Sequence, residues 1–207
     1  PTFFANSSTG NKYSLWVNVY GVSERYLNVY GEKDLRAQMN QFFHRTYTHP
    51  VDGTTLDMKM LCNWYWYDET AILETGKGTK DWNFYRYAET LLSAAEAIAQ
   101  SSGVNAEAAG YLAQVKARAN MEGKDVSTIA SELQRLGKQA FIEECWKERL
   151  REFPLEMKIW DDCVRTGKFP QISATNKGEV QFVDLIGATN GSGAKFKETD
   201  LYWPIPV

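Results

Sequence analysis

The stretch DWNFYRYAETLLSAAEAIAQSSGVNAEAAGYLAQVKARA, residues 81–119, decides the fold. Its first half predicts a helix over residues 82–101 that stops at Gly103, because apolar side chains recur there in steps of three and four, at Phe84, Ala88, Leu91, Ala95 and Ile98. A second helix is expected over residues 106–119, with Asn105 as its N-cap and a stripe of small side chains on one face. Small side chains let two helices approach closely, so the pair should form an antiparallel helical hairpin.

The next stretch predicts a second hairpin. A third helix is expected from Ser127 or Ser131 to Glu152, since Ser131 and Gln134 have the spacing of a capping box. Pro154 cannot continue that helix but can open a fourth, which should run to about Arg165 and stop at Gly167. Helical pairs in succession are typical of tetratricopeptide-like proteins, although the sequence has no 34-residue repeat.

The two flanking stretches are less regular. Residues 1–80 are rich in aromatic residues and glycines and predict irregular structure, with a strand-like segment at residues 13–20 and a short helix from Glu32 to Phe43. Residues 168–207 predict a loop-rich tail, held extended at Trp203–Pro206 by two prolines. We therefore expect a single, mainly α domain over residues 1–207, with helical hairpins at 81–167 and an irregular remainder.

Composition excludes several classes of protein. The 23 basic and 26 acidic residues give a net charge of −3, so no basic surface for nucleic acid is expected. No apolar run approaches the roughly 18 residues of a membrane span. The three cysteines are widely spaced and predict core residues rather than a disulfide framework or a zinc site. The chain begins at Pro1, so we expect a fragment whose targeting signal and any lipid anchor lie elsewhere.

Four segments in order resemble the SusD/RagB family of outer-membrane glycan-binding lipoproteins. DWNFYRYAETLLSAAEA at 81–97 is similar to the family helix RYAE-x-LL-x-x-AEA, and QVKARAN at 114–120 to VRxRAG. ERLREFPLEMKIWDDCVRTG at 148–167 resembles ERRxELxxEGxRWxDLxRTG, and LYWPIP at 201–206 resembles LxPIP. A shorter match, Gly31 to Arg36, resembles a family GDxR turn. The sequence departs from the family at Asn120 and Met157, where the family has Gly, and at Ile159, where it has Arg.

The resemblance implies both a fold and a function. The fold would be SusD-like, and ten signature residues would have structural roles: Arg86, Glu89, Glu96, Glu148, Arg149, Glu152, Trp160, Asp162, Arg165 and Gly167. The protein would be an outward-facing lipoprotein of the Bacteroidetes outer membrane that captures an oligo- or polysaccharide and passes it to a SusC-like TonB-dependent transporter. No bond would be broken and no cofactor or metal used. One alternative is a helical-repeat scaffold that docks the transporter with no sugar site in this fragment, and a less favoured one is a glycoside hydrolase.

The cluster Asn63-Trp64-Tyr65-Trp66-Tyr67 is the candidate glycan site. Flat aromatic rings stack on the apolar face of a sugar while neighbouring amide groups bind its hydroxyls. In an extended segment Trp64 and Trp66 would share one face. Either one of these side chains contacts the ligand or all of them are core. Weaker candidates are Trp16, Tyr20, Tyr26 and Tyr30, whereas Trp82, Trp146 and Trp160 lie on predicted helices and are expected in the core.

The charged residues predict structure rather than catalysis. Arg86 with Glu89, and the charges between Glu148 and Glu156, have the spacing of ion pairs that fix helix register, against the alternative of a polar active cleft. The adjacent carboxylates Asp161-Asp162 and Glu143-Glu144 would point apart on a helix, so neither pair suits a glycosidase. The spacing of His44, His49 and Asp52 does not favour a metal site.

Overall fold

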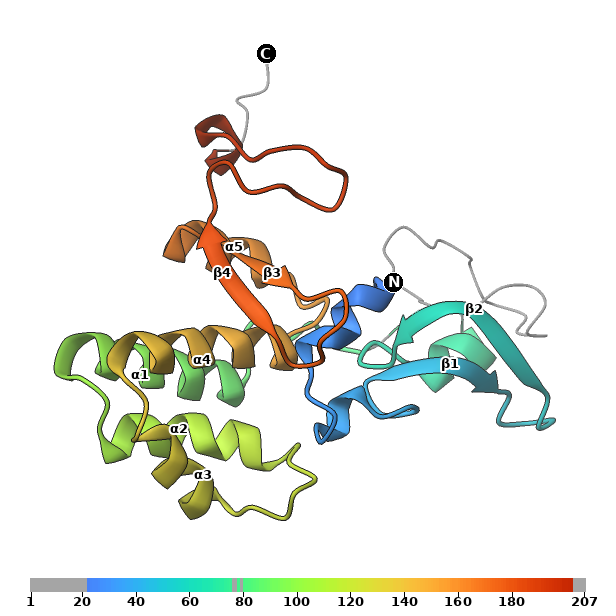
Figure 1. Ribbon diagram of the computed structural model, residues 1–207. Helices are drawn as coiled ribbons and strands as arrows, with labels where there is room; N and C mark the ends of the chain where they lie inside the picture. The colour runs from blue at the N-terminus through green and yellow to red at the C-terminus, as the bar shows by residue number, and fades with distance from the viewer. Residues whose placement is uncertain (1–21, 76–77, 79, 203–207) are drawn as a thin grey trace.

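The computed structural model describes residues 22–75, 78 and 80–202, and in this part of the chain the predicted mainly helical fold is confirmed (Figure 1). Helix α1, Tyr87–Ser102, and helix α2, Ala106–Ala117, form the predicted hairpin. Gly103 ends α1 with a φ of 81°, and the Asn105 side chain caps α2 by accepting from Ala108 N at 2.9 Å. Helix α1 begins five residues later than predicted, so Trp82 and Phe84 precede it.

The predicted third helix is in fact two helices. Helix α3, Val126–Leu133, is capped by Asp125, which accepts from Thr128 N at 2.8 Å. Helix α4, Lys138–Glu152, starts after Gly137, whose extended backbone interrupts the helix. The predicted capping box at Ser131 is wrong: the Ser131 hydroxyl donates to the Ser127 carbonyl within α3.

The fourth helix starts later than Pro154. Leu155 and Met157 have φ values of 59° and 58°, in the left-handed region that a right-handed helix excludes. Helix α5 therefore spans Ile159–Thr166. Its end is as predicted, because Gly167 is left-handed with a φ of 66°.

Two small antiparallel sheets flank the helices. Strand β1, Phe43–Thr48, pairs with β2, Thr55–Asn63, and the register shifts between His44 and Thr46. Strand β3, Lys168–Ile172, pairs with β4, Val180–Asp184, inside the stretch predicted to be loop-rich. Short 3-10 helices span Glu24–Val29, Leu35–Ala37 and Glu198–Leu201, and a short π-helix spans Ala71–Thr75.

The predicted helix from Glu32 to Phe43 is wrong. Only Leu35–Ala37 form a 3-10 turn, in which the Asp34 side chain accepts from Arg36 N at 3.0 Å. Asn40 then adopts a φ of 64°, which ends any helix before the strand at Phe43. The predicted strand at residues 13–20 and the extended segment at Trp203–Pro206 lie outside the described residues.

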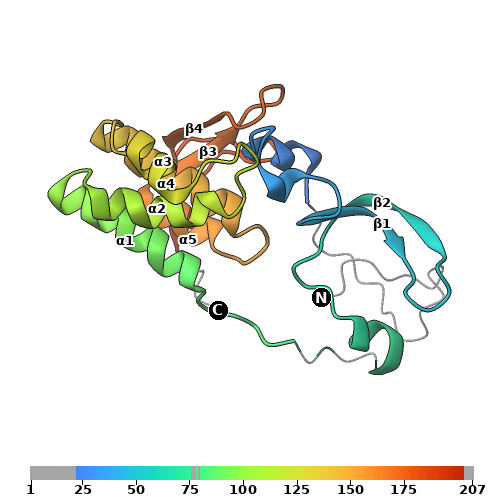
Figure 2. The same ribbon diagram turned by 90° about the horizontal axis from the view of Figure 1, so that it is seen from below.

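The buried side chains form two clusters joined through α4. The larger lies between α1, α2, α3 and α4, and its small residues include Ala95, Ala109 and Ala113, each 0% exposed. The smaller contains Tyr30, Phe43 and Leu150 and connects α4 to the β1–β2 hairpin. Helices α1–α4 thus stand on one side of the molecule and the β1–β2 hairpin on the other, with the 3-10 turn at Glu24–Val29 between them (Figures 1 and 2).

Candidate functional site

The predicted aromatic cluster is a turn at the end of β2, and we term residues 63–67 the aromatic turn. The side chain of Asn63 accepts from Tyr65 N at 2.7 Å, and Tyr67 N donates to the Trp64 carbonyl at 3.0 Å. An asparagine side chain that bonds to the backbone two residues on favours a turn over a strand. Trp64 and Trp66 therefore lie in a turn, and the shared face that an extended segment would give them does not arise.

Trp64 lies between two other rings. His44 stacks on it with ring centroids 3.7 Å apart, and Tyr67 stacks on it at 4.8 Å. Burial lowers the pKa of His44, so the imidazole is neutral at pH 7. Both faces of the Trp64 indole are covered by these protein rings.

Trp66 forms a second stack, with Trp82 at 4.4 Å. Trp82 is 41% exposed, so its predicted place in the core is wrong. Trp146 and Trp160 are half-buried and pack against Phe182 and Phe196.

Asn63 and two of the weaker candidates make contacts within the protein. Asn63 is 1% exposed, and its amide donates to the Pro154 carbonyl at 3.4 Å, which ties the aromatic turn to the end of α4. Tyr26 and Tyr30 donate their hydroxyls to the carbonyls of Leu150 and Arg151 at 2.5 and 2.9 Å. Trp16 and Tyr20 lie outside the described residues.

Tyr65 differs from its neighbours because it lines a cavity of about 300 Å³, here termed the Tyr65 pocket. The volume is at the lower end of the range for small-molecule pockets. The pocket has an apolar part and a polar part, and its lining consists of Leu35, Arg36, Gln41, Phe42, Tyr65, Arg86, Arg118, Ala119 and Glu152. Asn83 donates to the Tyr65 hydroxyl at 3.1 Å, and the Arg86 guanidinium lies 5.7 Å from the ring centre, so Tyr65 is held from two sides.

The polar part of the Tyr65 pocket is built around Glu152. Three guanidinium groups converge on this carboxylate, which is 2% exposed: Arg36 at 3.0 Å, Arg86 at 3.0 Å and Arg118 at 2.6 Å. Arg86 also binds Glu156 with two nitrogens, at 2.8 and 2.7 Å. Such charge-assisted, bidentate contacts fix the geometry of the side chains that make them.

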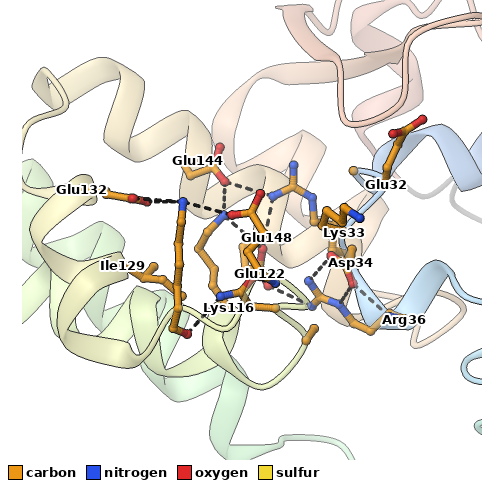
Figure 3. A pocket seen from close by; sticks show the side chains of 15 residues that line it. Glu32, Lys33, Asp34, Arg36, Lys116, Glu122, Ile129, Glu132, Glu144 and Glu148 are labelled. Atoms are coloured by element: carbon orange, nitrogen blue, oxygen red, sulfur yellow. Dashed lines mark hydrogen bonds and ion pairs between the residues drawn. The ribbon is translucent and has the colours of Figure 1, made fainter.

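A second, more polar cavity of about 330 Å³ shares Arg36 with the Tyr65 pocket as a lining residue (Figure 3). Glu144 and Glu148 reach it from α4, and Asp34 and Arg36 from the segment before β1. Arg36 contacts Asp34 at 2.7 Å and Glu148 at 2.8 Å, while Lys116 contacts Glu144. We term this second space the polar cavity.

Glu148 is the most buried charge in the polar cavity, with no exposed surface. Burial alone would raise its pKa, but the positive charges of Arg36, Lys116 and Arg151 outweigh burial and lower the pKa to about 2. Across both cavities the network balances, because five cations (Arg36, Arg86, Lys116, Arg118, Arg151) face five carboxylates (Asp34, Glu144, Glu148, Glu152, Glu156).

The signature residues pair mainly across elements. The predicted Arg86–Glu89 pairing is replaced: Arg86 contacts Glu152 and Glu156, whereas Glu89 contacts Arg149 at 3.4 Å. Arg149 on α4 contacts Asp162 on α5 at 2.7 Å, and Arg165 on α5 contacts Glu96 on α1 at 2.7 Å. The expectation of pairs along one helix holds for Arg151–Glu148 and Arg165–Asp162. The charged members of the signature thus make ion pairs that mostly join different elements.

Sequence reasoning missed Arg36, Lys116 and Arg118 as parts of the site. The signal for Arg36 was the short match from Gly31 to Arg36, in which Asp34 and Arg36 bind each other bidentately. Arg118 lies in the segment 114–120 that resembles the family, but nothing in its spacing shows that it faces Glu152, 34 residues away. Asn120, which replaces the family's Gly, donates to the Lys124 carbonyl and orders the turn beside the polar cavity.

Other chemistries find little support in the described residues. Cys62, Cys145 and Cys163 are buried, and burial raises the pKa of Cys62 and of Cys163 to about 11, which disfavours a thiolate nucleophile. His44 stacks on Trp64, while His49 lies 3.4 Å from Asp52. In the part of the chain that the structure describes, no group of three or more acidic, histidine or cysteine side chains is arranged to hold a metal. Among the same residues no helix is long and apolar enough to cross a membrane.

Comparison with known proteins places this arrangement of paired helices and small sheets in a known class. The chain belongs to the SusD family, whose model matches residues 8–207. Among solved structures it is similar to a SusD superfamily protein from Parabacteroides distasonis, with 28% sequence identity and a TM-score of 0.74. That match covers 89% of this chain and 38% of the other, so the chain spans well under half of its relative. A comparison with curated proteins gives no match.

Proposed function

We propose that this chain binds a glycan at the aromatic turn and the adjoining Tyr65 pocket, and that it breaks no bond in doing so. The observation that carries the proposal is the pocket itself, in which the rings of Tyr65 and Phe42 lie beside the polar side chains of Gln41 and Arg118. A sugar ring has an apolar face and a fringe of hydroxyls, and this combination of surfaces complements both. Of the five predicted site residues, Tyr65 is the one that lines the pocket.

The wider role follows from family membership. We propose that the protein is an outward-facing lipoprotein of the bacterial outer membrane, which captures an oligo- or polysaccharide and passes it to a SusC-like TonB-dependent transporter. The helical pairs would then contact the transporter, while the aromatic turn at the end of β2 and the adjoining Tyr65 pocket meet the sugar.

Calorimetric titration with a panel of oligosaccharides tests glycan binding. Tyr65→Ala should weaken binding about tenfold or more, since it removes the ring that lines the pocket. The matched control is Tyr202→Ala, which removes a 75% exposed tyrosine that does not line the pocket. Equal affinity for the Tyr65→Ala variant and the control would refute the proposed site. Release of reducing ends that grows with time would overturn the absence of catalysis.

A scaffold without a sugar site is the second candidate function. It is favoured by the two ring stacks, because Trp64 is covered on both faces and Trp66 packs on Trp82. On this view the aromatic turn serves only to dock the hairpin against α4. Failure of the unsubstituted chain to bind any oligosaccharide of the panel would support the scaffold, and binding that is lost in a Trp64→Ala, Tyr65→Ala, Trp66→Ala triple variant would contradict it.

A further inference from the structure

The charges that line the two cavities are distributed unevenly. The Tyr65 pocket is lined by three positive side chains, Arg36, Arg86 and Arg118, and by one negative side chain, Glu152. The polar cavity is close to balanced, with five positive side chains (Lys33, Arg36, Lys116, Lys124, Arg151) and six negative ones (Glu32, Asp34, Glu122, Glu132, Glu144, Glu148). Arg86 and Arg118 thus line the Tyr65 pocket alone, whereas Arg36 lines both cavities.

The hydrogen-bonding capacity of the Tyr65 pocket is uneven as well. Both carboxylate oxygens of Glu152 already accept from arginine, so they offer little to a ligand. Arg36 is occupied by Asp34, Glu148 and Glu152, and Arg86 by Glu152 and Glu156. The hydrogen-bonding groups of Arg36, Arg86 and Glu152 are therefore largely engaged within the protein.

Arg118 is the guanidinium with donors to spare. It makes a single contact among the described residues, from one terminal nitrogen to Glu152, and its side chain is 58% exposed. An arginine offers five N–H groups in a planar fork that matches a carboxylate. Arg118 can therefore hold Glu152 with one edge and receive a ligand with another.

We infer that the Tyr65 pocket selects a sugar that carries a carboxylate, a uronate, and that Arg118 binds the acid group. This inference rests on the proposed glycan site and names the substrate class that the site takes. The ring of the sugar lies against Tyr65 and Phe42, while its carboxylate, which only accepts hydrogen bonds, meets the N–H groups of Arg118 that Glu152 leaves unused. The contact with Glu152 holds Arg118 in place before any ligand binds.

The test compares an acidic ligand with its methyl ester, in which the negative charges are removed and the sugar rings are kept. Trigalacturonate and its fully methyl-esterified form share the same rings, and both are titrated calorimetrically into the 207-residue chain. The acid should bind about tenfold more tightly than the ester, and the difference should shrink at high salt because screening weakens the ion pair. Equal affinity for acid and ester would overturn the inference.

Two variants and a control locate the acid group. Arg118→Gln should lower the affinity for the acid to that of the ester, and Arg118→Lys should give an intermediate value because it keeps the charge but loses the fork. Arg135→Gln removes an exposed arginine outside the pocket and should change neither affinity. Circular dichroism verifies that each variant is folded.

The outcomes separate this inference from the proposed function. If acid and ester bind equally and Tyr65→Ala weakens both, the glycan site stands and the preference for uronates is refuted. If Arg118→Gln binds the acid as tightly as Arg135→Gln does, the role of Arg118 is refuted. If neither these ligands nor the neutral oligosaccharides bind, both proposals fail.

Discussion

The buried carboxylate of Glu148 makes the stability of this protein depend on pH. Glu148 is fully buried among Arg36, Lys116 and Arg151, and its pKa is lowered from the ordinary 4.5 to about 2. This difference corresponds to a contribution on the order of 3 kcal/mol to the free energy of unfolding at neutral pH. Because the pKa is lowered in the folded state, the contribution is complete above pH 4.5 and is lost as the pH falls toward 2.

The change Glu148→Gln removes this charge and keeps the shape of the side chain. At pH 7 the variant should lose about 3 kcal/mol, since three cations are left around a neutral amide. Urea unfolding followed by tryptophan fluorescence measures the loss, and the series is repeated in steps from pH 7 to pH 3. The gap between parent and variant should narrow below pH 4.5, because the unfolded parent then takes up a proton at Glu148 while the folded parent, with a pKa of about 2, stays ionised.

The matched control is Glu143→Gln on the same helix. Glu143 accepts from Gln139 at an exposed position, so the same loss of charge there should change the free energy of unfolding by less than about 0.5 kcal/mol. A Glu148→Gln variant as stable as this control at pH 7 would refute the reasoning. So would a stability gap that stays constant down to pH 3.

Three further predictions concern the backbone and the aromatic turn. Gly167→Ala should lower the free energy of unfolding by about 1–2 kcal/mol, measured by thermal or urea unfolding, because φ is 66°. Gly110→Ala inside α2, where an added methyl group meets no atom within 4 Å, should raise the free energy of unfolding by up to about 1 kcal/mol. A change of the same sign in both variants would contradict this reasoning. Met157→Gly should raise the free energy of unfolding by about 0.5–1 kcal/mol, because it relieves the backbone strain of a φ of 58° at an exposed position. A lower free energy of unfolding would show that the contacts of the Met157 side chain outweigh this strain. Trp64→Ala should lower the free energy of unfolding by about 2–3 kcal/mol, more than Trp82→Ala does, because the rings of His44 and Tyr67 both lose their stacking partner. A larger loss for Trp82→Ala than for Trp64→Ala would contradict this reasoning.

The helices were predictable because their signals are local. Each signal comes from residues that are close together in the sequence: the helical spacing of apolar residues from Ala88 to Ala95, the N-cap at Asn105 and the helix stop at Gly167. The break at Gly137 was missed because apolar residues recur at helical spacing both before and after it. Hydrophobic periodicity alone therefore does not show that the helix is interrupted there. The left-handed Leu155 and Met157 were missed because neither residue type favours that conformation.

The candidate site was predictable only in part. The local sequence drew attention to Tyr65, which lines the pocket, but it gave no sign that the Asn63 side chain makes a turn there. The charges were noticed, but their partners come from elements far apart in the chain, such as Arg86 and Glu156, which are separated by 70 residues. Spacing in sequence describes neighbours on one helix and contains no information about such contacts.

The charge network also bears on the order in which the chain folds. Arg36 and Glu152 are 116 residues apart, so their contact closes a long loop and costs much chain entropy before it returns any stability. Helices α1–α4 depend on nearer neighbours and can assemble first. Burial of the Glu148 carboxylate is costly until the segment of Arg36 has docked beside it. We therefore expect the contact between Arg36 and Glu148 to form late in folding, when the β1–β2 hairpin packs against the helices.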